Sequence, residues 1–342
     1  MNEMVFQCAL IGCGRIGCGF DDNSQLIRTH AGAYYNNSRT SLVALCDIDE
    51  NKLSKYGKKY PVVNLYQDYK EMLRHEKLDL ISICTLVDSH YTIISEAAKY
   101  GVKGIFLEKP MADTLFHAKK IIEICNKNDI SLLIDYQRRF IPVYYKIKDY
   151  ILSGNLGKIQ KIIVYYGAGI ANTGSHIFDL LYFLFGSVRS IYAKSSPNSS
   201  HTVIDPNLDV ELVFTNGISC SIISFDVTHY GILEMEIFGS SGRLFLDMGN
   251  HEVNHFVVSK KDSLVYRQLV PKKFPNTKKI DEPIVKGLKN LLECVQTKKK
   301  SLCDGKDGYI SLELVMASLI SASKNKEISL PLSTLNYSLQ SK

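Results

Sequence analysis

Apolar runs and amphipathic segments alternate in the amino-terminal part of the chain. A strand buried on both faces is apolar at nearly every position, whereas a helix repeats its apolar residues every three or four positions. Apolar runs that predict strands cover residues 5–11, 41–47, 78–85, 104–110 and 131–136. Helical patterns fall between them, from near His30 and over 66–76, 89–101 and 114–128. This alternation predicts an α/β fold with a doubly wound parallel sheet.

The pattern changes after a tyrosine- and lysine-rich helix expected at 142–153. Apolar and polar residues then alternate with a period of two, which is typical of strands that bury one face. These strands are expected at 158–166, 190–195, 209–214, 218–225, 233–239, 243–247, 252–259 and 263–270. Turn sequences such as Asn216-Gly217 and Ser241-Gly242 predict a large, mostly antiparallel open sheet. A last helix at about 306–324 is expected to pack back on the body.

The change of pattern divides the chain into two predicted domains. Residues 1–130 are expected to form a Rossmann domain, and residues 131–342 an α+β domain for substrate binding and oligomerisation. A length of 342 residues also favours two domains over one. Because alternating strands leave a second sheet face to cover, we expect a homodimer or homotetramer formed through that open face.

Composition and charge restrict the partners of the protein. No apolar run reaches the roughly 18 residues that span a bilayer, and the first residues resemble no secretory signal, so no membrane partner is expected. Nine cysteines without CxxC pairs predict reduced thiols, a cytoplasmic location and no metal site. The formal charge of +6 comes from scattered lysines, and therefore predicts no nucleic-acid partner.

A glycine-rich turn follows the first predicted strand. Gly12, Gly14 and Gly17 have the GxGxxG spacing, with Arg15 and Ile16 between the last two. This spacing after a strand is the fingerprint of a dinucleotide pyrophosphate site, in which the glycines allow a tight turn, close approach of the phosphates and close packing. All five residues are therefore expected to contact a cofactor, although the same glycines could form an ordinary loop.

The second predicted strand ends at Asp47, where a carboxylate would accept hydrogen bonds from a ribose diol and repel a 2'-phosphate. NAD is therefore favoured over NADP as the cofactor. Asp47 follows Gly17 by 30 residues rather than the usual 20 or so. We attribute the difference to an inserted loop at residues 18–29, which is rich in turn formers and has no helical period. The alternative is that Asp47 is only a turn residue.

Five further segments give the chain a family resemblance. They are CTLVDSH at 84–90, EKP at 108–110, QRRFIP at 137–142, NTGSHIFD at 172–179 and DGKDGYISLEL at 304–314. With the glycine turn, their order resembles that of the Gfo/Idh/MocA oxidoreductases over almost the whole chain. The resemblance implies an NAD-dependent enzyme that transfers hydride to or from a sugar-type hydroxyl.

Lys109 is the first candidate catalytic residue. It follows a predicted parallel strand, at the sheet edge where ligands bind, and its ammonium could stabilise alkoxide character as hydride leaves. The alternative is a solvated surface lysine. The resemblance implies a cis bond before Pro110, and Glu108, which precedes the lysine, is expected to touch the cofactor.

His176 is the second candidate. It falls early in a predicted helix whose inner face also carries Asp179, which could orient the imidazole. A histidine there can accept the hydroxyl proton, although an inward histidine can also be structural. The resemblance places the family's active-site histidine on His176. Where the family has aspartate four residues earlier, this chain has Asn172, which could orient substrate but cannot act as a base.

The remaining site residues are assigned mainly from the resemblance. Thr85, Leu86 and His90 correspond to the family segment beside the nicotinamide ribose. Arg139 would face the cleft between domains and bind a carboxylate or phosphate, or else be a structural ion-pair partner. The asparagine at 172 resembles the nucleotide-sugar and surface-glycan branch of the family. Two other functions stay open: a redox-neutral lyase or glycosidase with tightly held NAD, and an NAD-binding regulator without turnover.

Overall fold

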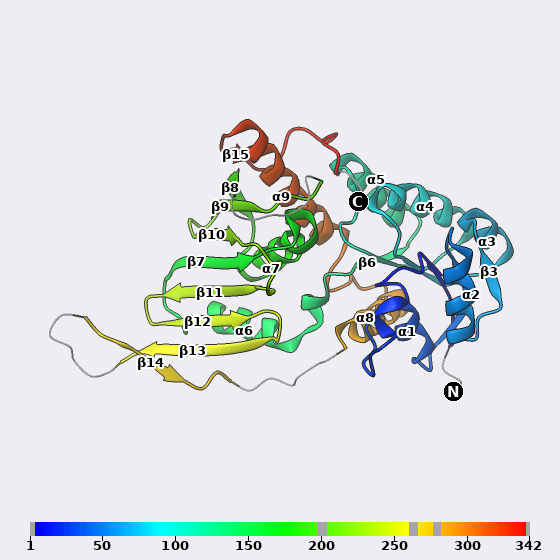
Figure 1. Cartoon of the computed structure of the whole chain (residues 1–342), viewed down its shortest axis with the longest axis horizontal. Helices are drawn as coiled ribbons and strands as arrows, with labels where there is room; N and C mark the ends of the chain where they lie inside the picture. The colour runs from blue at the N-terminus through cyan, green and yellow to red at the C-terminus, as the bar shows by residue number, and fades with distance from the viewer. Residues whose placement is uncertain (1–3, 197–203, 260–265, 276–281, 340–342) are drawn as a thin grey trace. The chain divides into compact units, whose positions relative to one another are not determined.

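The structure is a computed structural model that describes residues 4–196, 204–259, 266–275 and 282–339. The chain forms two compact units (Figure 1). The first unit comprises Met1–Phe140, Ile280–Tyr309 and Asn336–Lys342, and the second comprises Ile141–Lys279 and Ile310–Leu335. A segment far along the chain, from Ile280 to Tyr309, is thus part of the unit that carries the glycine turn.

The first unit contains a six-stranded parallel sheet in the order β3-β2-β1-β4-β5-β6, which is the Rossmann order. Its strands are β1 (Phe6–Ile11), β2 (Thr40–Cys46), β3 (Asn64–Tyr66), β4 (Leu80–Ile83), β5 (Gly104–Leu107) and β6 (Ser131–Ile134). Every residue of β4 and β5 is buried, as expected for strands covered on both faces. The predicted doubly wound sheet is confirmed.

Helices follow the strands as a doubly wound sheet requires. The helices of this unit are α1 (His30–Tyr35), α2 (Glu50–Lys59), α3 (Tyr69–His75), α4 (His90–Ala97), α5 (Leu115–Lys127) and α8 (Pro283–Thr297), with short helical turns η1 (Gly19–Asp21), η2 (Val87–Ser89), η3 (Ala98–Tyr100) and η4 (Gln137–Phe140). Side chains cap several of these helices; the Asp49 carboxylate, for example, accepts hydrogen bonds from the first turn of α2. The start of α1 at His30 confirms the sequence prediction.

Two apolar clusters hold the helices on this sheet. One joins Phe6 and Phe106 of the strands to Leu288 and Leu291 of α8. The other joins Leu10 and Leu45 to Leu53 of α2 and its neighbours. The sequence pattern does not predict α2, although this helix buries apolar side chains against the sheet.

The second unit contains a nine-stranded sheet in the order β14-β13-β12-β11-β7-β10-β9-β8-β15. Its strands are β7 (Ile159–Tyr166), β8 (Val188–Ser195), β9 (Leu208–Phe214), β10 (Ser219–Ser224), β11 (Glu234–Gly239), β12 (Gly242–Asp247), β13 (Glu252–Val258), β14 (Leu269–Lys272) and β15 (Ile328–Ser329). Its helices are α6 (Pro142–Leu152), α7 (Ser175–Phe185) and the greater part of α9 (Gly305–Lys324), with a wide helical turn η5 (Gly169–Gly174). The strand predicted over 263–270 begins in residues that lie outside the described part of the chain.

Strand pairing in this sheet is mostly antiparallel, as predicted, with one exception. Gly217, at a φ of +84°, forms the turn between β9 and β10, and a hairpin also joins β11 to β12. β7 and β10, however, run parallel. The chain between them contains α7 and two strands, so their direction is set by a long connection rather than by a tight turn. Among the described residues, no helix is both long and apolar enough to cross a membrane.

Candidate active site

The carboxyl ends of the parallel strands bring the predicted residues of the first unit to one sheet edge. The glycine turn follows β1, Asp47 follows β2, Thr85 follows β4 and Lys109 follows β5. Since β2 and β5 lie on opposite sides of β1, the edge is bounded by Asp47 at one end and Lys109 at the other. Ligands of open α/β sheets bind at this edge.

The three glycines of the turn differ in what surrounds them. Gly12 has a φ of +96°, and a Cβ there would lie 2.6 Å from the Cys84 carbonyl oxygen. A Cβ on Gly17 would lie 2.1 Å from the Gly12 carbonyl oxygen. By contrast, a Cβ on Gly14 would meet no protein atom within 4 Å. The fold therefore requires glycine at 12 and 17, whereas at 14 it leaves open space for a ligand.

Asp47 ties the glycine turn to the second strand. Its Oδ2 accepts a hydrogen bond from the Cys13 backbone N–H at 2.6 Å, and its Oδ1 accepts one from the Asp49 N–H at 2.9 Å. An ionised carboxylate offers about four acceptor positions, so two bonds leave capacity for a ribose diol. The two bonds thus hold the half-buried Asp47 side chain in place, and its carboxylate can still accept further hydrogen bonds.

The two ends of the inserted loop, residues 18–29, lie next to each other. The backbone N–H of His30 donates to the Ile16 carbonyl oxygen at 3.2 Å, and that of Ala31 donates to the Gly17 carbonyl oxygen at 2.9 Å. The first turn of α1 is therefore attached directly to the glycine turn, as it would be without the loop. These bonds support the interpretation of residues 18–29 as an insertion.

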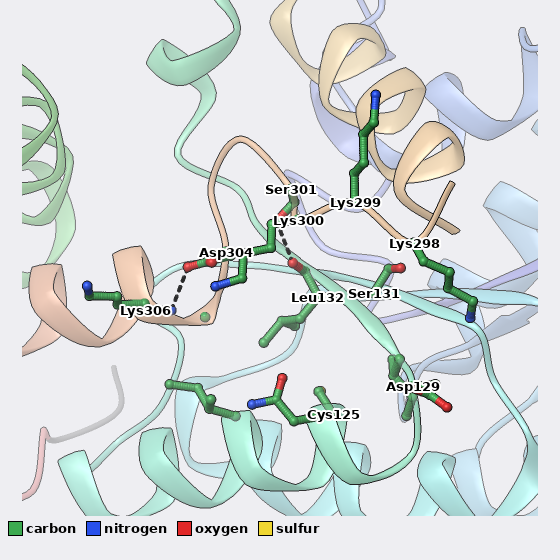
Figure 2. A pocket seen from close by; sticks show the side chains of 14 residues that line it. Cys125, Asp129, Ser131, Leu132, Lys298, Lys299, Lys300, Ser301, Asp304 and Lys306 are labelled. Carbon is green, nitrogen blue, oxygen red and sulfur yellow. Dashed lines mark hydrogen bonds between the residues drawn. The ribbon is translucent and has the colours of Figure 1, made fainter. Parts of the chain in front are cut away.

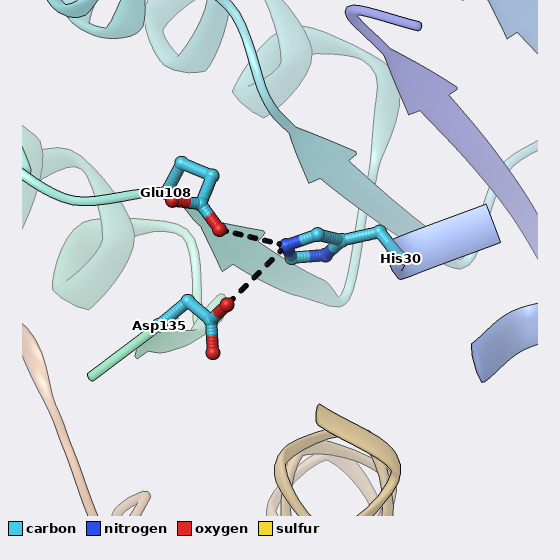
Figure 3. A group of neighbouring side chains, drawn as sticks. All are labelled: His30, Glu108 and Asp135. Atoms are coloured by element: carbon cyan, nitrogen blue, oxygen red, sulfur yellow. Dashed lines mark hydrogen bonds and ion pairs between the residues drawn. The ribbon is translucent and has the colours of Figure 1, made fainter. Parts of the chain in front are cut away.

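A buried polar cluster lies below the same sheet edge (Figure 3). The Nε2 atom of His30 lies 3.1 Å from Glu108 Oε1 and 3.6 Å from Asp135 Oδ2. On the other side of the ring, Nδ1 lies 2.9 Å from the Ser82 hydroxyl oxygen. His30 is 1% exposed, Glu108 7% and Asp135 2%, so water does not solvate these charges. Sequence reasoning missed the cluster.

The imidazole ring and the two carboxyl groups of this cluster shift one another's pKa values. Burial alone would lower the pKa of His30, but Cys84, Asp135 and Glu108 outweigh it and hold that pKa well above its ordinary value. Burial, reinforced by the charge of Asp135, raises the pKa of Glu108 to about 7. Burial also opposes ionisation of Asp135, yet the hydrogen bond with His30 lowers its pKa.

The same three side chains are of the types that bind a divalent cation, and their ligand atoms lie within 4.8 Å of one another. The distance of 3.1 Å between His30 and Glu108 is nevertheless that of a direct hydrogen bond, so the ring and the carboxyl group satisfy each other without an ion. We therefore interpret His30, Glu108 and Asp135 as a proton-holding network, in which hydrogen bonds between the buried side chains retain a proton.

Glu108 connects this network to Lys109. Its second oxygen, Oε2, accepts a hydrogen bond from the Lys109 backbone N–H at 3.3 Å. The Lys109 side chain is half-buried, and the Lys109–Pro110 bond is cis, as the family resemblance implies. The Glu108 carboxyl group thus lies beneath the lysine, with little exposed surface for the predicted contact with the cofactor.

The residues after β4 divide into exposed and buried ones. The Thr85 hydroxyl lies 2.6 Å from that of Ser89, and Leu86 is 57% exposed. His90 is buried, with Nε2 at 3.2 Å from the Thr85 carbonyl oxygen and Nδ1 at 3.4 Å from that of Met111. Burial lowers the pKa of His90, so its neutral ring joins the segments that follow β4 and β5. Thr85 and Leu86 are therefore the members of the predicted trio that are not buried, and their contact with a cofactor stays a prediction.

The candidates of the second unit lie around the start of α7. His176 is the second residue of that helix and is half-buried, and Asp179, one turn later, is 1% exposed. Asn172 is exposed on η5. Its side-chain amide donates to the Ala168 carbonyl oxygen at 3.2 Å. The predicted helix and its inward Asp179 are confirmed, while the roles of these residues stay predictions.

Asp205, which sequence reasoning missed, holds the turn that carries Asn172. Its carboxylate accepts hydrogen bonds from the backbone N–H groups of Ala171 at 2.7 Å and Asn172 at 3.1 Å. A Cβ on Gly169 would lie 2.0 Å from Asp205 Oδ2, so only glycine leaves room for this carboxylate. Because Asp205 is remote from this turn in sequence, no local motif indicates the contact.

Arg139 forms an ion pair of the kind expected for the structural alternative, while its predicted contact with substrate stays a prediction. It is 5% exposed, and its Nη2 lies 3.2 Å from Asp307 Oδ1 in the same unit. This contact engages one of the two terminal nitrogens of the guanidinium with a carboxylate. The structure therefore connects Arg139 to the first turn of α9.

Two cavities of the first unit contain charged side chains. One, of about 450 Å³, is formed by the glycine turn, the inserted loop and α2. The other, of about 290 Å³, lies at the amino end of β6 and includes Lys298, Lys299 and Lys300 (Figure 2). In Figure 2, Lys298 and Lys299 point in different directions, so these cations do not converge on one ligand position. The first cavity is the one that adjoins the predicted cofactor residues.

Comparison with known proteins agrees with this geometry. The family profile described as "Oxidoreductase family, NAD-binding Rossmann fold" matches residues 6–136, and the profile of its C-terminal alpha/beta domain matches residues 167–330. D-apiose dehydrogenase of Paraburkholderia graminis is 25% identical, over 95% of this chain and 90% of that protein. Myo-inositol 2-dehydrogenase of Thermotoga maritima is 24% identical, over 94% and 97%.

Among solved structures, the WlbA dehydrogenase of Bordetella pertussis in complex with NADH and UDP-GlcNAcA has a similar fold. Its TM-score is 0.77 at 22% identity, covering 96% of this chain and 100% of that one. A levoglucosan dehydrogenase in complex with NADH and levoglucosan has a TM-score of 0.77 at 17% identity, with coverage of 96% and 100%. At these identities the likeness shows the fold.

Proposed function

The chain belongs to the Gfo/Idh/MocA family of oxidoreductases, whose first domain is an NAD-binding Rossmann fold. From this premise we propose that it transfers a hydride between NAD and a secondary hydroxyl or ketone of a sugar or nucleotide sugar. The observation that carries the proposal is the position of Lys109. It follows β5 at the sheet edge that also holds the glycine turn and Asp47, all within one compact unit.

Each proposed role follows from the chemistry of the side chain. NAD, held by the glycine turn and Asp47, would supply the hydride acceptor or donor. The Lys109 ammonium donates a hydrogen bond to the substrate oxygen, which stabilises negative charge on that oxygen as the C–H bond breaks. We assign the proton transfer to His176, because an imidazole titrates near neutrality. Asn172, exposed on η5, is assigned to orient the substrate through its amide.

The relatives support a polyhydroxylated substrate. They include dehydrogenases of D-apiose and of myo-inositol, both of which carry several hydroxyl groups. The nucleotide-sugar alternative rests on Asn172, which stands where the family pattern has aspartate. Substrate recognition is assigned to residues of η5 and α7, and the predicted substrate contact of Arg139 is retained beside its buried ion pair with Asp307.

Lys109→Ala tests the proposal in a screen of sugars, polyols and nucleotide sugars with NAD, followed by the absorbance of NADH. We expect one substrate class to produce NADH and Lys109→Ala to lower turnover at least about 100-fold, since one oxyanion donor contributes about that much. NADH affinity should stay within about threefold, because the lost group acts on the substrate.

Lys103→Ala is the matched control. Lys103 precedes the same strand, β5, at the opposite sheet edge, where it forms an exposed ion pair with Asp79. Its replacement should leave turnover unchanged. Full activity in Lys109→Ala would contradict the assigned role. Consumption of substrate without added NAD and without net NADH would instead identify a redox-neutral lyase or glycosidase.

A further inference from the structure

The inserted loop is fixed to its surroundings at several points. The Asp21 carboxylate accepts hydrogen bonds from the Arg28 backbone N–H at 2.6 Å and the Thr29 hydroxyl at 2.5 Å, which closes the loop on itself. Asp22 accepts hydrogen bonds from two lysines and a tyrosine of α2: Lys55 at 2.7 Å, Lys59 at 3.0 Å and Tyr56 at 3.1 Å. Together with the backbone hydrogen bond from His30 to Ile16, these bonds hold the loop in one conformation.

The hydrogen bond from Lys55, aided by Lys59 and Tyr56, lowers the pKa of Asp22 to about 2. The anchor is therefore ionised throughout the neutral range. Its negative charge is matched by the two lysines of α2 that bind it. Asp22 also lines the cavity next to the loop, and because of this pairing its carboxylate contributes little net negative potential there.

The cavity of about 450 Å³ lies between this loop and the glycine turn. Its lining includes Gly14 and Arg15 of the turn, Phe20 and Arg28 of the loop, and Lys52 of α2. The Arg15 guanidinium carbon lies 4.7 Å from the centroid of the Phe20 ring, so a loop residue supports an arginine of the fingerprint. Three cationic side chains thus border a space next to Gly14, the glycine of the turn at which a Cβ would meet no protein atom within 4 Å.

The position of the cavity identifies the part of the dinucleotide that fits it. α2 follows β2, the strand that ends at Asp47, and β2 lies on the opposite side of β1 from β5 and Lys109. The nicotinamide must be near Lys109 if that residue acts on the substrate. The cavity is therefore on the adenosine side of the dinucleotide, where an aromatic ring and cations suit a nucleobase and a phosphate.

We propose that the inserted loop forms a fixed wall of the adenosine-phosphate subsite and that Arg28 binds the adenosine half of NAD. This inference rests on the proposed function, because it assumes that the protein binds NAD at the glycine turn. It assigns the loop to the cofactor rather than to the substrate. Arg28 is exposed in the structure, so its side chain is available to a ligand.

Binding of NADH, AMP and nicotinamide mononucleotide to Arg28→Ala tests the proposal by titration calorimetry. The substitution keeps the backbone N–H that binds Asp21, so the loop conformation is preserved. We expect NADH and AMP to bind about 5- to 20-fold more weakly, the effect of losing one charge-assisted contact to a phosphate. Binding of nicotinamide mononucleotide should not change. Arg28→Lys should recover part of the loss, because it restores the charge but not the planar fork.

Arg74→Ala is the matched control, since Arg74 is an exposed arginine at the end of α3 and is absent from the cavity lining. It should bind all three ligands like the wild type. Unchanged NADH binding in Arg28→Ala would overturn the inference and leave the proposed function intact. Weakened binding of nicotinamide mononucleotide alone would also overturn it. Failure of the wild type to bind NADH would overturn the proposed function itself.

Discussion

At the scale of single residues, the glycines of the turn are needed for two different reasons. The fold itself requires glycine at positions 12 and 17, whereas at position 14 the requirement comes from a bound ligand. Gly12 and Gly17 leave room for neighbouring backbone carbonyl groups, so any side chain there collides with the protein. Gly14 has no such neighbour and no positive φ. Its conformation is open to other residues, and only a bound ligand explains why a side chain would be harmful.

Gly14→Ala should therefore weaken NADH binding at least about tenfold without lowering stability. The free energy of unfolding should stay the same or rise by up to about 1 kcal/mol, because alanine restricts the unfolded chain. Fluorescence titration of NADH and thermal unfolding measure the two effects.

Gly17→Ala provides the contrast, because its Cβ would lie 2.1 Å from the Gly12 carbonyl oxygen. This variant should lose about 2–4 kcal/mol of stability through backbone displacement. A Gly14→Ala protein that binds NADH normally would show that no ligand approaches this residue.

At the scale of elements, α1 and the ends of β5 and β6 join in one proton-holding network. The folded protein keeps a proton on Glu108 up to about pH 7, whereas an unfolded carboxyl group loses it near its ordinary pKa of 4.5. Between these values the folded state binds more protons than the unfolded state. The stabilising contribution of Glu108 is thus fully present below about pH 4.5 and is lost as pH rises through about 7. The raised pKa of His30 acts in the same direction above its ordinary value of 6.5.

Glu108→Gln should flatten this pH dependence between about pH 5 and 6.5, because an amide does not titrate. Urea unfolding at several pH values would measure the slope. Glu123→Gln, which alters an exposed ion pair with Lys120 on α5, should retain the wild-type slope. If Glu108→Gln and the wild type have the same slope, the carboxyl group is already ionised in the folded protein.

The elements differ in how well the sequence predicts them. Apolar runs predict all strands of the first sheet except the three-residue β3, because burial on both faces leaves a continuous signal. α2 is missed because lysine, glutamate and asparagine dominate it and it buries only Leu53, Tyr56 and Gly57. The helix expected at 66–76 begins only at Tyr69, since its first residue belongs to β3. The parallel pairing of β7 with β10 depends on a long connection, which periodicity does not encode.

The parts of the candidate site that lie within one short motif can be predicted from the sequence. Contacts between residues far apart in the sequence cannot, because only the fold brings them together. The glycine turn and the EKP segment each lie within a few residues, so the sequence predicts them together with the strands that precede them. His30 and Glu108 are separated by 78 positions, and only the sheet order brings them together. The same is true of Asp205, whose contact with Asn172 spans 33 positions.

At the scale of the whole molecule, the sheet of the second unit has two different faces. Val210, Ile222, Val164 and Met235 share one cross-strand row and are buried. Glu211, Ser221, Ile163 and Glu236 form the neighbouring row on the other face, where Ile163 is half-buried. The prediction that copies of the chain associate through the sheet concerns this second face.

Light scattering should therefore give the mass of a dimer or tetramer. Ile163→Lys, which places a further charge in the middle of the open face, should shift the protein toward the monomer without unfolding it, because a charged side chain loses its hydration when an interface covers it. Leu152→Lys is the control, because Leu152 is 72% exposed at the end of α6, outside the sheet. A wild-type protein that is monomeric at micromolar concentration would contradict the predicted assembly.

His30 and Ala31, which follow the inserted loop, are hydrogen-bonded to Ile16 and Gly17, which precede it. Residues 18–29 can therefore be exchanged as a cassette. A dehydrogenase whose first helix follows its glycine turn directly could receive this cassette without a shift of that helix. The graft would need lysines at the positions of Lys55 and Lys59 on the second helix, since these residues hold the cassette through Asp22. Cofactor affinity could then be engineered separately from the catalytic end of the sheet.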